Sequence, residues 1–274
     1  MVPGDAFLLT DTHCHLDFEA FNSDRDLVLE RAREAGLTRI LNPGIDLLSS
    51  RAALTLSDEY KEVYAAVGVH PNSALSFDEH TLQHIRELSS HPKVVAIGEI
   101  GLDYFRDKAP RDLQMRVFRS QLDLASELGL PVIIHNRHAT TDILSVLSEW
   151  QSQLVKATSP LSDKPGVLHS YSDSIESGKK AIAINFLIGI TGPVTFKNAY
   201  DLQHVVTGLP VTKMIIETDA PFLTPHPRRG QRNEPALVRR VAEKIAELHS
   251  CPVEDIALAT SENADRLFNW RVMA

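Results

Sequence analysis

Short apolar runs alternate with longer amphipathic segments along most of the chain. The amphipathic segments include residues 26–37, 80–90 and 112–130, where apolar residues recur at roughly helical spacing. Continuous apolar strands that alternate with helices predict a parallel sheet covered on its faces. The sequence contains eight runs of this kind, at residues 7–13, 39–44, 63–70, 94–101, 131–136, 166–170, 186–191 and 213–219.

Eight strand–helix units predict a (β/α)8 barrel of the TIM type. The length of 274 residues suits one such barrel, so we expect a single domain over residues 1–274. Gly36 and Gly129 are expected to end two of the helices in the left-handed conformation. Two more helical patterns follow Glu234: residues 234–250 complete the eighth unit, and residues 252–270 predict an extra C-terminal helix packed on the barrel.

The alternative is an open, doubly wound sheet, which has the same alternation of strands and helices. Such a sheet usually carries a glycine-rich phosphate loop after its first strand. Here the first run, "FLLTDTH", leads into His-Cys-His instead. This ending favours the barrel.

Composition narrows the class of protein. The net charge of −8 argues against a wholly basic protein surface for binding nucleic acid. A divalent metal and a few local lysine and arginine side chains can still bind phosphates. The two cysteines, Cys14 and Cys251, imply no disulfide framework and favour a reducing compartment. The start of the chain lacks the pattern of a signal peptide, and no run approaches the length of a membrane span. We therefore expect a cytoplasmic protein with no membrane partner.

The stretch "DTHCHLD" places His13 and His15 one residue apart directly after an apolar run. Residues i and i+2 of a strand point to the same face, so both imidazoles could reach one ion. Cys14, between them, should then face away and pack as a small apolar residue. Two ordinary histidines at a strand end are the alternative interpretation of this short motif.

Other polar residues fall at or near the ends of the predicted strands. In a barrel the carboxyl ends of the strands surround the active site, so residues far apart in sequence converge there. Each of these residues has an ordinary explanation on its own, such as a turn residue, a core histidine or a helix cap. Together they predict a metal site at the barrel mouth. The residues at these strand ends are His13, His15, His70, Glu99, His135, His169, Glu217 and Asp219. Six of them are the candidate ligands: His13, His15, Glu99, His135, His169 and Asp219.

Imidazoles favour zinc, manganese or iron, and carboxylates also admit magnesium. The number of candidate ligands exceeds what one tetrahedral ion needs, so we expect two divalent ions (Zn, Mn or Mg). Glu99 is the expected bridge, because its two oxygens can each hold one ion. Asp219 could bind an ion and also act as general base toward a metal-activated water. The chain has no GxSxG or GxxxxGK[ST] motif, which disfavours a serine nucleophile and nucleotide-driven chemistry.

Eight motifs lie in order across nearly the entire chain: "DTHCHLD", "GVHP", "GEIGLDY", "PVIIH", "LHSY", "ETDAPFLTP", "RNEP" and "NADRLF". Together they resemble the TatD family of metal-dependent deoxyribonucleases, within the amidohydrolase-like barrel superfamily. The resemblance implies a (β/α)8 barrel, a divalent-metal centre and hydrolysis of DNA phosphodiesters. It gives His70 no ligand role, which leaves this residue as a candidate contact to substrate phosphate. The ligands that the resemblance implies are His13, His15, Glu99, His135, His169 and Asp219.

The chain departs from the family pattern in two loops. Where the family commonly continues the strand-five histidine with Ser-Arg-Asp-Ala, this chain has residues 136–139, Asn-Arg-His-Ala. Where the family has Cys-Phe-Ser-Gly after strand six, this chain has residues 170–173, Ser-Tyr-Ser-Asp. Both loops border the mouth, so the changes bear on the choice of substrate. His138 adds a possible cation or ligand, and Asp173 adds a charge that could repel phosphate.

Local cations near the mouth are the expected contacts to a DNA substrate: Arg137, Lys197 and Arg232, with Arg229 a further candidate. One alternative is hydrolysis of a small ester, lactone, amide or phosphoester on the same barrel, since fold alone does not set substrate. A second is a non-catalytic metal-binding quality-control protein. Structural metal sites are usually closed and sulfur-rich, so a histidine–carboxylate set at an open mouth favours catalysis. The sequence does not predict the oligomeric state.

Overall fold

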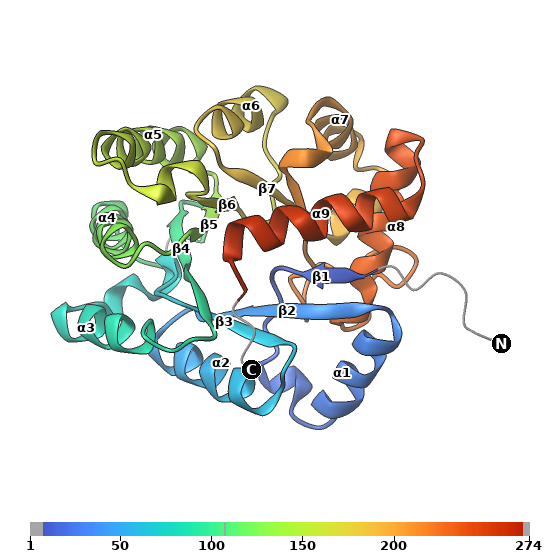
Figure 1. The fold of residues 1–274 in the computed structure, drawn as a ribbon, viewed down its shortest axis with the longest axis horizontal. Helices are drawn as coiled ribbons and strands as arrows, with labels where there is room; N and C mark the ends of the chain where they lie inside the picture. The colour runs from blue at the N-terminus through green and yellow to red at the C-terminus, as the bar shows by residue number, and fades with distance from the viewer. Residues whose placement is uncertain (1–7, 107, 271–274) are drawn as a thin grey trace.

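The structure, a computed structural model, describes residues 8–106 and 108–270. In these residues eight parallel strands form one sheet whose spatial order follows the sequence from β1 to β8 (Figure 1). A doubly wound sheet would show its strands out of sequence order, so the barrel prediction is confirmed. The strands are β1 (Leu9–Asp11), β2 (Leu37–Pro43), β3 (Val63–Val67), β4 (Val94–Asp103), β5 (Val132–Arg137), β6 (Gly166–Leu168), β7 (Leu187–Ile190) and β8 (Met214–Ile216).

Helices connect successive strands and surround the sheet (Figure 1). Gly36 and Gly129 take positive φ angles of 92° and 66° at the ends of α1 and α4, as predicted. None of the helices in the described residues is both long and apolar enough to cross a membrane. The helices are α1 (Arg25–Glu34), α2 (Leu47–Glu59), α3 (Glu79–Leu88), α4 (Arg111–Leu128), α5 (Thr140–Lys156), α6 (Ile175–Ala183), α7 (Tyr200–Gly208), α8 (Val238–His249) and α9 (Val253–Phe268).

The segments just beyond β1 and β8 bring the two ends of the sheet together. Thr12 N–H donates to Ile216 O at 3.2 Å, and an isolated parallel bridge joins Cys14 to Ala220. The buried carboxylate of Asp11 accepts hydrogen bonds from the backbone N–H and the hydroxyl of Thr218. These contacts nearly close the barrel. They also bring the polar segments that follow the two strands side by side.

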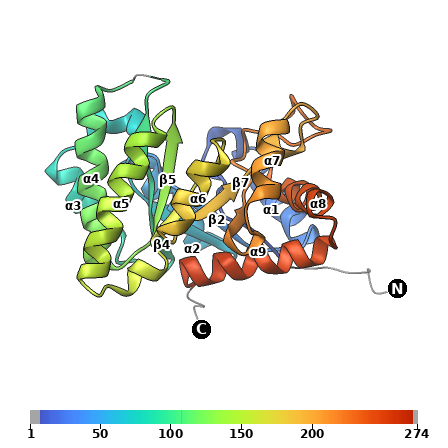
Figure 2. The same ribbon diagram turned by 90° about the horizontal axis from the view of Figure 1, so that it is seen from above.

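The extra C-terminal helix covers one end of the barrel. Figure 1 shows α9 crossing in front of the strands, and Figure 2 shows it running along one end of the molecule. Leu267, Phe268 and Trp270 join a buried cluster with residues such as Val95 and Ile133 from the strands. Because α9 seals the end where the strands begin, the opposite end is the one left for the site.

Several strand ends differ from the predicted runs. β4 and β5 run past residues 101 and 136, to Asp103 and Arg137. β1, β3 and β8 end earlier than predicted, so His13, His15 and His70 lie just beyond their strands. The pairing of β4 with β5 shifts register between Ile97 and Ile100, and this irregularity lets Glu99 project toward the mouth from within a strand. The first predicted run begins at residue 7, which lies outside the described residues.

Candidate metal centre

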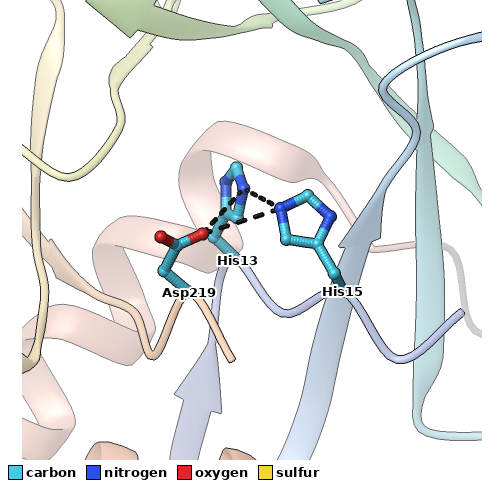
Figure 3. Close-up of side chains that lie close together, drawn as sticks. All are labelled: His13, His15 and Asp219. Carbon is cyan, nitrogen blue, oxygen red and sulfur yellow. Dashed lines mark hydrogen bonds and ion pairs between the residues drawn. The ribbon is translucent and has the colours of Figure 1, made fainter. Parts of the chain in front are cut away.

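His13 and His15 point at each other across a small triangle completed by Asp219 (Figure 3). Their Nε2 atoms are 3.3 Å apart, and Asp219 Oδ1 lies 3.8 Å from the first and 3.6 Å from the second. Cys14 faces the other way and is fully buried in the main apolar cluster, as predicted.

Backbone pairing between the two ends of the barrel builds this triangle. Asp219 N–H donates to His13 O and His15 N–H donates to Ala220 O, both at 2.8 Å. Asp219 takes a left-handed φ of 56°, a conformation that Asp adopts more readily than most residues. The carboxylate therefore reaches the histidines because β1 and β8 are neighbours, although 204 positions separate it from His15 in sequence.

The spacing of the three atoms suits a metal ion. Ligand bonds of about 2.0–2.1 Å in a tetrahedral site place neighbouring ligand atoms about 3.3–3.4 Å apart. The three distances here run from 3.3 to 3.8 Å. The donor set of two imidazoles and a carboxylate also suits zinc or manganese.

Glu99 lies between two groups of imidazoles. Its Oε2 atom is 3.4 Å from His13 Nε2, and its Oε1 atom is 2.7 Å from His135 Nδ1. Gly101 makes the approach possible, because a Cβ there would lie 2.0 Å from His135 O and its φ is +144°. One carboxylate thus faces two candidate ion sites, each oxygen toward a different one. Among the residues that the structure describes, three groups place their ligand atoms close enough to hold an ion: His13–His15–Asp219, His13–Glu99–His169 and His70–Glu99–His135.

Both carboxylates of the centre are held in the charged form. Burial alone would raise the pKa of Glu99, but the surrounding imidazoles, including the hydrogen-bonding rings of His13 and His135, hold it well below the usual range. Burial likewise opposes ionisation of Asp219, and the hydrogen bond from His15 with the charge of His169 lowers its pKa. Ionised carboxylates of this kind attract cations.

His169 follows β6 and is oriented by Glu217. Glu217 Oε2 lies 2.9 Å from His169 Nδ1, and His169 Nε2 then faces Asp219 Oδ1 at 3.6 Å. Burial lowers the basicity of this ring, but the Glu217 charge outweighs it and raises the pKa of His169 to about 10. A Cβ at Gly189 would lie 2.4 Å from Glu217 Oε1, so this position must lack a side chain for the carboxylate to fit.

Asp103 faces His135 in a looser arrangement and from the other ring nitrogen. Its Oδ2 atom lies 3.4 Å from His135 Nε2, while Oδ1 accepts the N–H groups of Phe105 and Arg106. Sequence analysis assigned no role to Asp103 and none beyond a strand-end position to Glu217. The available signal was their place in "GEIGLDY" and "ETDAP", each a few residues from a candidate ligand.

The structure brings His70 into the centre as well. Its Nε2 atom lies 3.6 Å from Glu99 Oε1. Its Nδ1 atom accepts a hydrogen bond from Asn72 N–H at 3.0 Å. Burial and the neighbouring His135 lower the pKa of His70 to about 3, so the ring is neutral and carries its proton on Nε2.

The predicted cations lie in different surroundings. The Arg137 guanidinium, at the end of β5, packs 4.2 Å from the ring centre of Phe105, and Lys197 is exposed in the loop after β7. Arg229 packs over Phe196 at 4.0 Å. Arg232 instead makes two hydrogen bonds of 2.7 Å to the carboxylate of Asp24.

The two loops that depart from the family pattern also differ from each other. His138 is exposed, with a φ of 57°, and its ring packs edge-on against Phe105. Asp173 accepts hydrogen bonds from the Thr140 hydroxyl and from Ser174 N–H. Its charge is thus partly met by neighbouring donors.

Comparison with known proteins agrees with this picture. The family model of TatD related DNase matches residues 10–269. The uncharacterized metal-dependent hydrolase YabD of Bacillus subtilis is 46% identical over 95% of this chain and 99% of its own length. The 3'-5' ssDNA/RNA exonuclease TatD of Erwinia tasmaniensis is 34% identical over 94% of this chain and 99% of its own. The crystal structure of YjjV, a TatD homologue from Escherichia coli, superposes with a TM-score of 0.88 at 32% identity, covering 97% of this chain and 99% of that one.

Barrel, candidate ligand clusters and relatives together define an enzyme of the metal-dependent hydrolase class. Within that class, the chain belongs to the TatD related DNase family.

Proposed function

We propose that the protein hydrolyses phosphodiester bonds in DNA with two divalent ions held at the barrel mouth. The observation that carries this proposal is the position of Glu99, whose two oxygens face two different groups of candidate ligands. Two ions a few ångströms apart suit phosphoryl transfer, because they can stabilise both the attacking and the leaving oxygen.

The roles of the residues follow from their positions. His13, His15 and Asp219 would hold one ion, and Glu99 would link it to a second ion. The remaining candidate ligands, His135 and His169, each form a group with Glu99 and are assigned to that second ion. The ions, when bound, acidify water and offset the charge that develops on the phosphate. Asp219 is ionised and faces the centre, so it accepts the proton that the attacking water loses. Glu217 and Asp103 orient His169 and His135.

His70 suits a different role, contact with the substrate. Because Nδ1 of His70 accepts from Asn72, the proton of the neutral ring lies on Nε2, which points into the centre as a donor. We therefore assign His70 to the substrate and not to an ion. A neutral donor at this position can hydrogen-bond a phosphate oxygen. Arg137 and Lys197 are the proposed contacts to neighbouring phosphates. Arg232 is left out, because its donors are engaged by Asp24.

The names of relatives support the nucleic-acid substrate. The family is described as TatD related DNase, and the Erwinia relative is named for action on single-stranded DNA and RNA. Small esters, lactones and amides are the competing substrates.

We also infer that the barrel is one hydrolase domain, because segments from both ends of the described chain build it. We infer a cytoplasmic location, because Cys14 and Cys251 are both free thiols.

The test is turnover by metal-free protein with zinc, manganese and magnesium added back singly. The substrates are end-labelled single- and double-stranded DNA, RNA of the same sequence, and a panel of small lactones and amides. Metal-dependent cleavage of DNA supports the proposal, and turnover confined to the small substrates overturns it. A His13→Ala/His15→Ala double variant serves as the inactive reference, and His80→Ala, an exposed histidine on α3, is its matched control.

A further inference from the structure

The large aromatic residues that are exposed in the described chain all lie on the face that carries the metal centre. They are Phe105, Tyr200 and Phe222, and each follows the carboxyl end of a strand. A single exposed apolar side chain is ordinary, but exposed aromatic rings that gather on the face of a candidate site are suited to contact a ligand. Two of the three, Phe105 and Phe222, are also linked to residues of the metal centre by hydrogen bonds of their backbone N–H groups.

Phe222 stands beside the His13–His15–Asp219 triangle. Its backbone N–H donates to Asp219 O at 2.8 Å, and its carbonyl accepts from Asn233 Nδ2 at 2.6 Å. Its ring packs edge-on against Phe18 at 5.9 Å, and Phe18 stacks on the His15 ring at 4.7 Å. Even so, 51% of Phe222 is exposed. The ring is held in place and still offers a surface.

Phe105 stands beside the other half of the centre. Its backbone N–H donates to Asp103 Oδ1 at 3.0 Å, and Asp103 in turn faces His135. The Arg137 guanidinium covers the ring at 4.2 Å and His138 packs edge-on at 5.0 Å, yet 55% of Phe105 is exposed. An aromatic ring next to an arginine is a common device for binding single-stranded nucleic acid.

The barrel places these two rings across the mouth from each other. Phe105 follows β4 and Phe222 follows β8, and in a ring of eight strands in sequence order these strands are opposite. The centre lies between them, with Glu99 from β4 and Asp219 after β8. A DNA strand whose phosphate lies at the metal centre would therefore pass one aromatic ring on each side.

We propose that Phe222 and Phe105 are stacking platforms for the bases on either side of the cleaved phosphate, and that they select single-stranded substrate. This inference rests on the proposed phosphodiesterase function and assigns its specificity to two residues. Bases of a duplex are already stacked on their neighbours and paired, so they cannot lie flat on a protein ring without being unstacked. Bases of a single strand are free to do so.

The test compares Phe222→Ala and Phe105→Ala with wild type on a short single-stranded oligonucleotide and on methyl p-nitrophenyl phosphate. Each variant should lose about 5- to 150-fold in kcat/KM on the oligonucleotide, the range measured for one stacked base. The loss on the small diester should be much smaller. Leu258→Ala, an exposed residue on α9 at the other end of the barrel, is the matched control and should match wild type. Phe222→Leu keeps an apolar contact with Phe18 but has no aromatic face, so it should lose as much activity as Phe222→Ala. Phe222→Tyr keeps the aromatic face and should retain wild-type activity.

Oligonucleotides that lack one base next to the cleaved bond sharpen the test. Removing the base should slow the wild type and leave the corresponding alanine variant almost unaffected, because the partner ring is already gone. Equal losses in wild type and variant, or alanine variants that match Leu258→Ala, would overturn the inference while the phosphodiesterase function stands.

Binding separates the inference from the proposed function. A phosphorothioate oligonucleotide carrying 2-aminopurine next to the central linkage should lose fluorescence on wild-type protein and not on the alanine variants. If the fluorescence differs in this way but the wild-type protein hydrolyses no phosphodiester, the proposed function is refuted and the stacking role of the two rings is supported. Identical fluorescence with wild type and both variants would refute the platforms.

Discussion

The carboxylate of Glu217 lies 2.9 Å from His169 Nδ1, and both groups are buried. This contact fixes the imidazole so that Nε2 faces Asp219. The same carboxylate oxygen also accepts the N–H of Ser170 at 2.9 Å, which ties the start of the loop after β6 to the end of β8. Glu217 is therefore an orienting group. Its replacement should weaken ion binding and leave the packing of the core unchanged.

Glu217→Gln should weaken binding of one ion by about 10- to 100-fold, as is typical when the partner of a ligating histidine is changed. The neutral amide fills the same space, but it no longer favours the proton on Nδ1 or strengthens the basicity of Nε2. Competition titration with a chelating dye measures the affinity. Unchanged affinity at both sites would show that His169 is not a ligand oriented by Glu217.

Glu99→Gln should weaken both ion sites together. The two oxygens of Glu99 face different clusters, and an amide presents one oxygen and one donor, which makes it a poor bridge. Calorimetric titration of metal-free protein should show two weakened events. Loss of only one event would mean that Glu99 serves a single ion.

Arg137→Ala should reduce activity on oligonucleotides by about 10- to 100-fold, equivalent to about 1.4 to 3 kcal/mol for one charge-assisted contact. The effect on a small activated phosphodiester should be clearly smaller, since that substrate has no second phosphate. Steady-state kinetics on both substrates measure the ratio. Arg240→Ala, an exposed arginine on α8, is the control. Equal losses on both substrates would argue against a contact to a neighbouring phosphate.

Asp24→Asn should destabilise the protein at neutral pH by about 0.5 to 1 kcal/mol, the range of a partly exposed ion pair. The hydrogen bonds and charge of Arg232 hold the pKa of Asp24 below its ordinary value of 3.8. The stabilisation is therefore complete above the unfolded-state pKa and is lost as pH falls through the lower folded-state pKa. Urea unfolding at neutral pH and below about pH 4 should show the difference between variant and wild type shrinking in acid. A pH-independent difference would mean that the charge of Asp24 is not what stabilises the fold.

The sequence by itself determined the barrel and the kinds of side chain that gather at its mouth. Alternation of apolar runs and amphipathic helices is a local property, and its period is set by backbone geometry, so it can be read without knowing any distant contact. The spacing of His13 and His15 is local in the same way, and their Nε2 atoms do converge. The types of candidate ligands were also evident, because imidazole and carboxylate groups recur beside the ends of the apolar runs.

Only the tertiary structure decided which of these groups meet. The register shift that lets Glu99 project from within β4 depends on the neighbouring strand β5, and the pairing of Glu217 with His169 joins residues 48 positions apart. Arg232 was expected at the substrate, yet it lies beside Asp24, from which 208 positions separate it. Such contacts depend on how the ring of strands closes. They also depend on which charged side chains find a partner in the neighbouring segments. These are properties of the whole chain, and no local pattern encodes them.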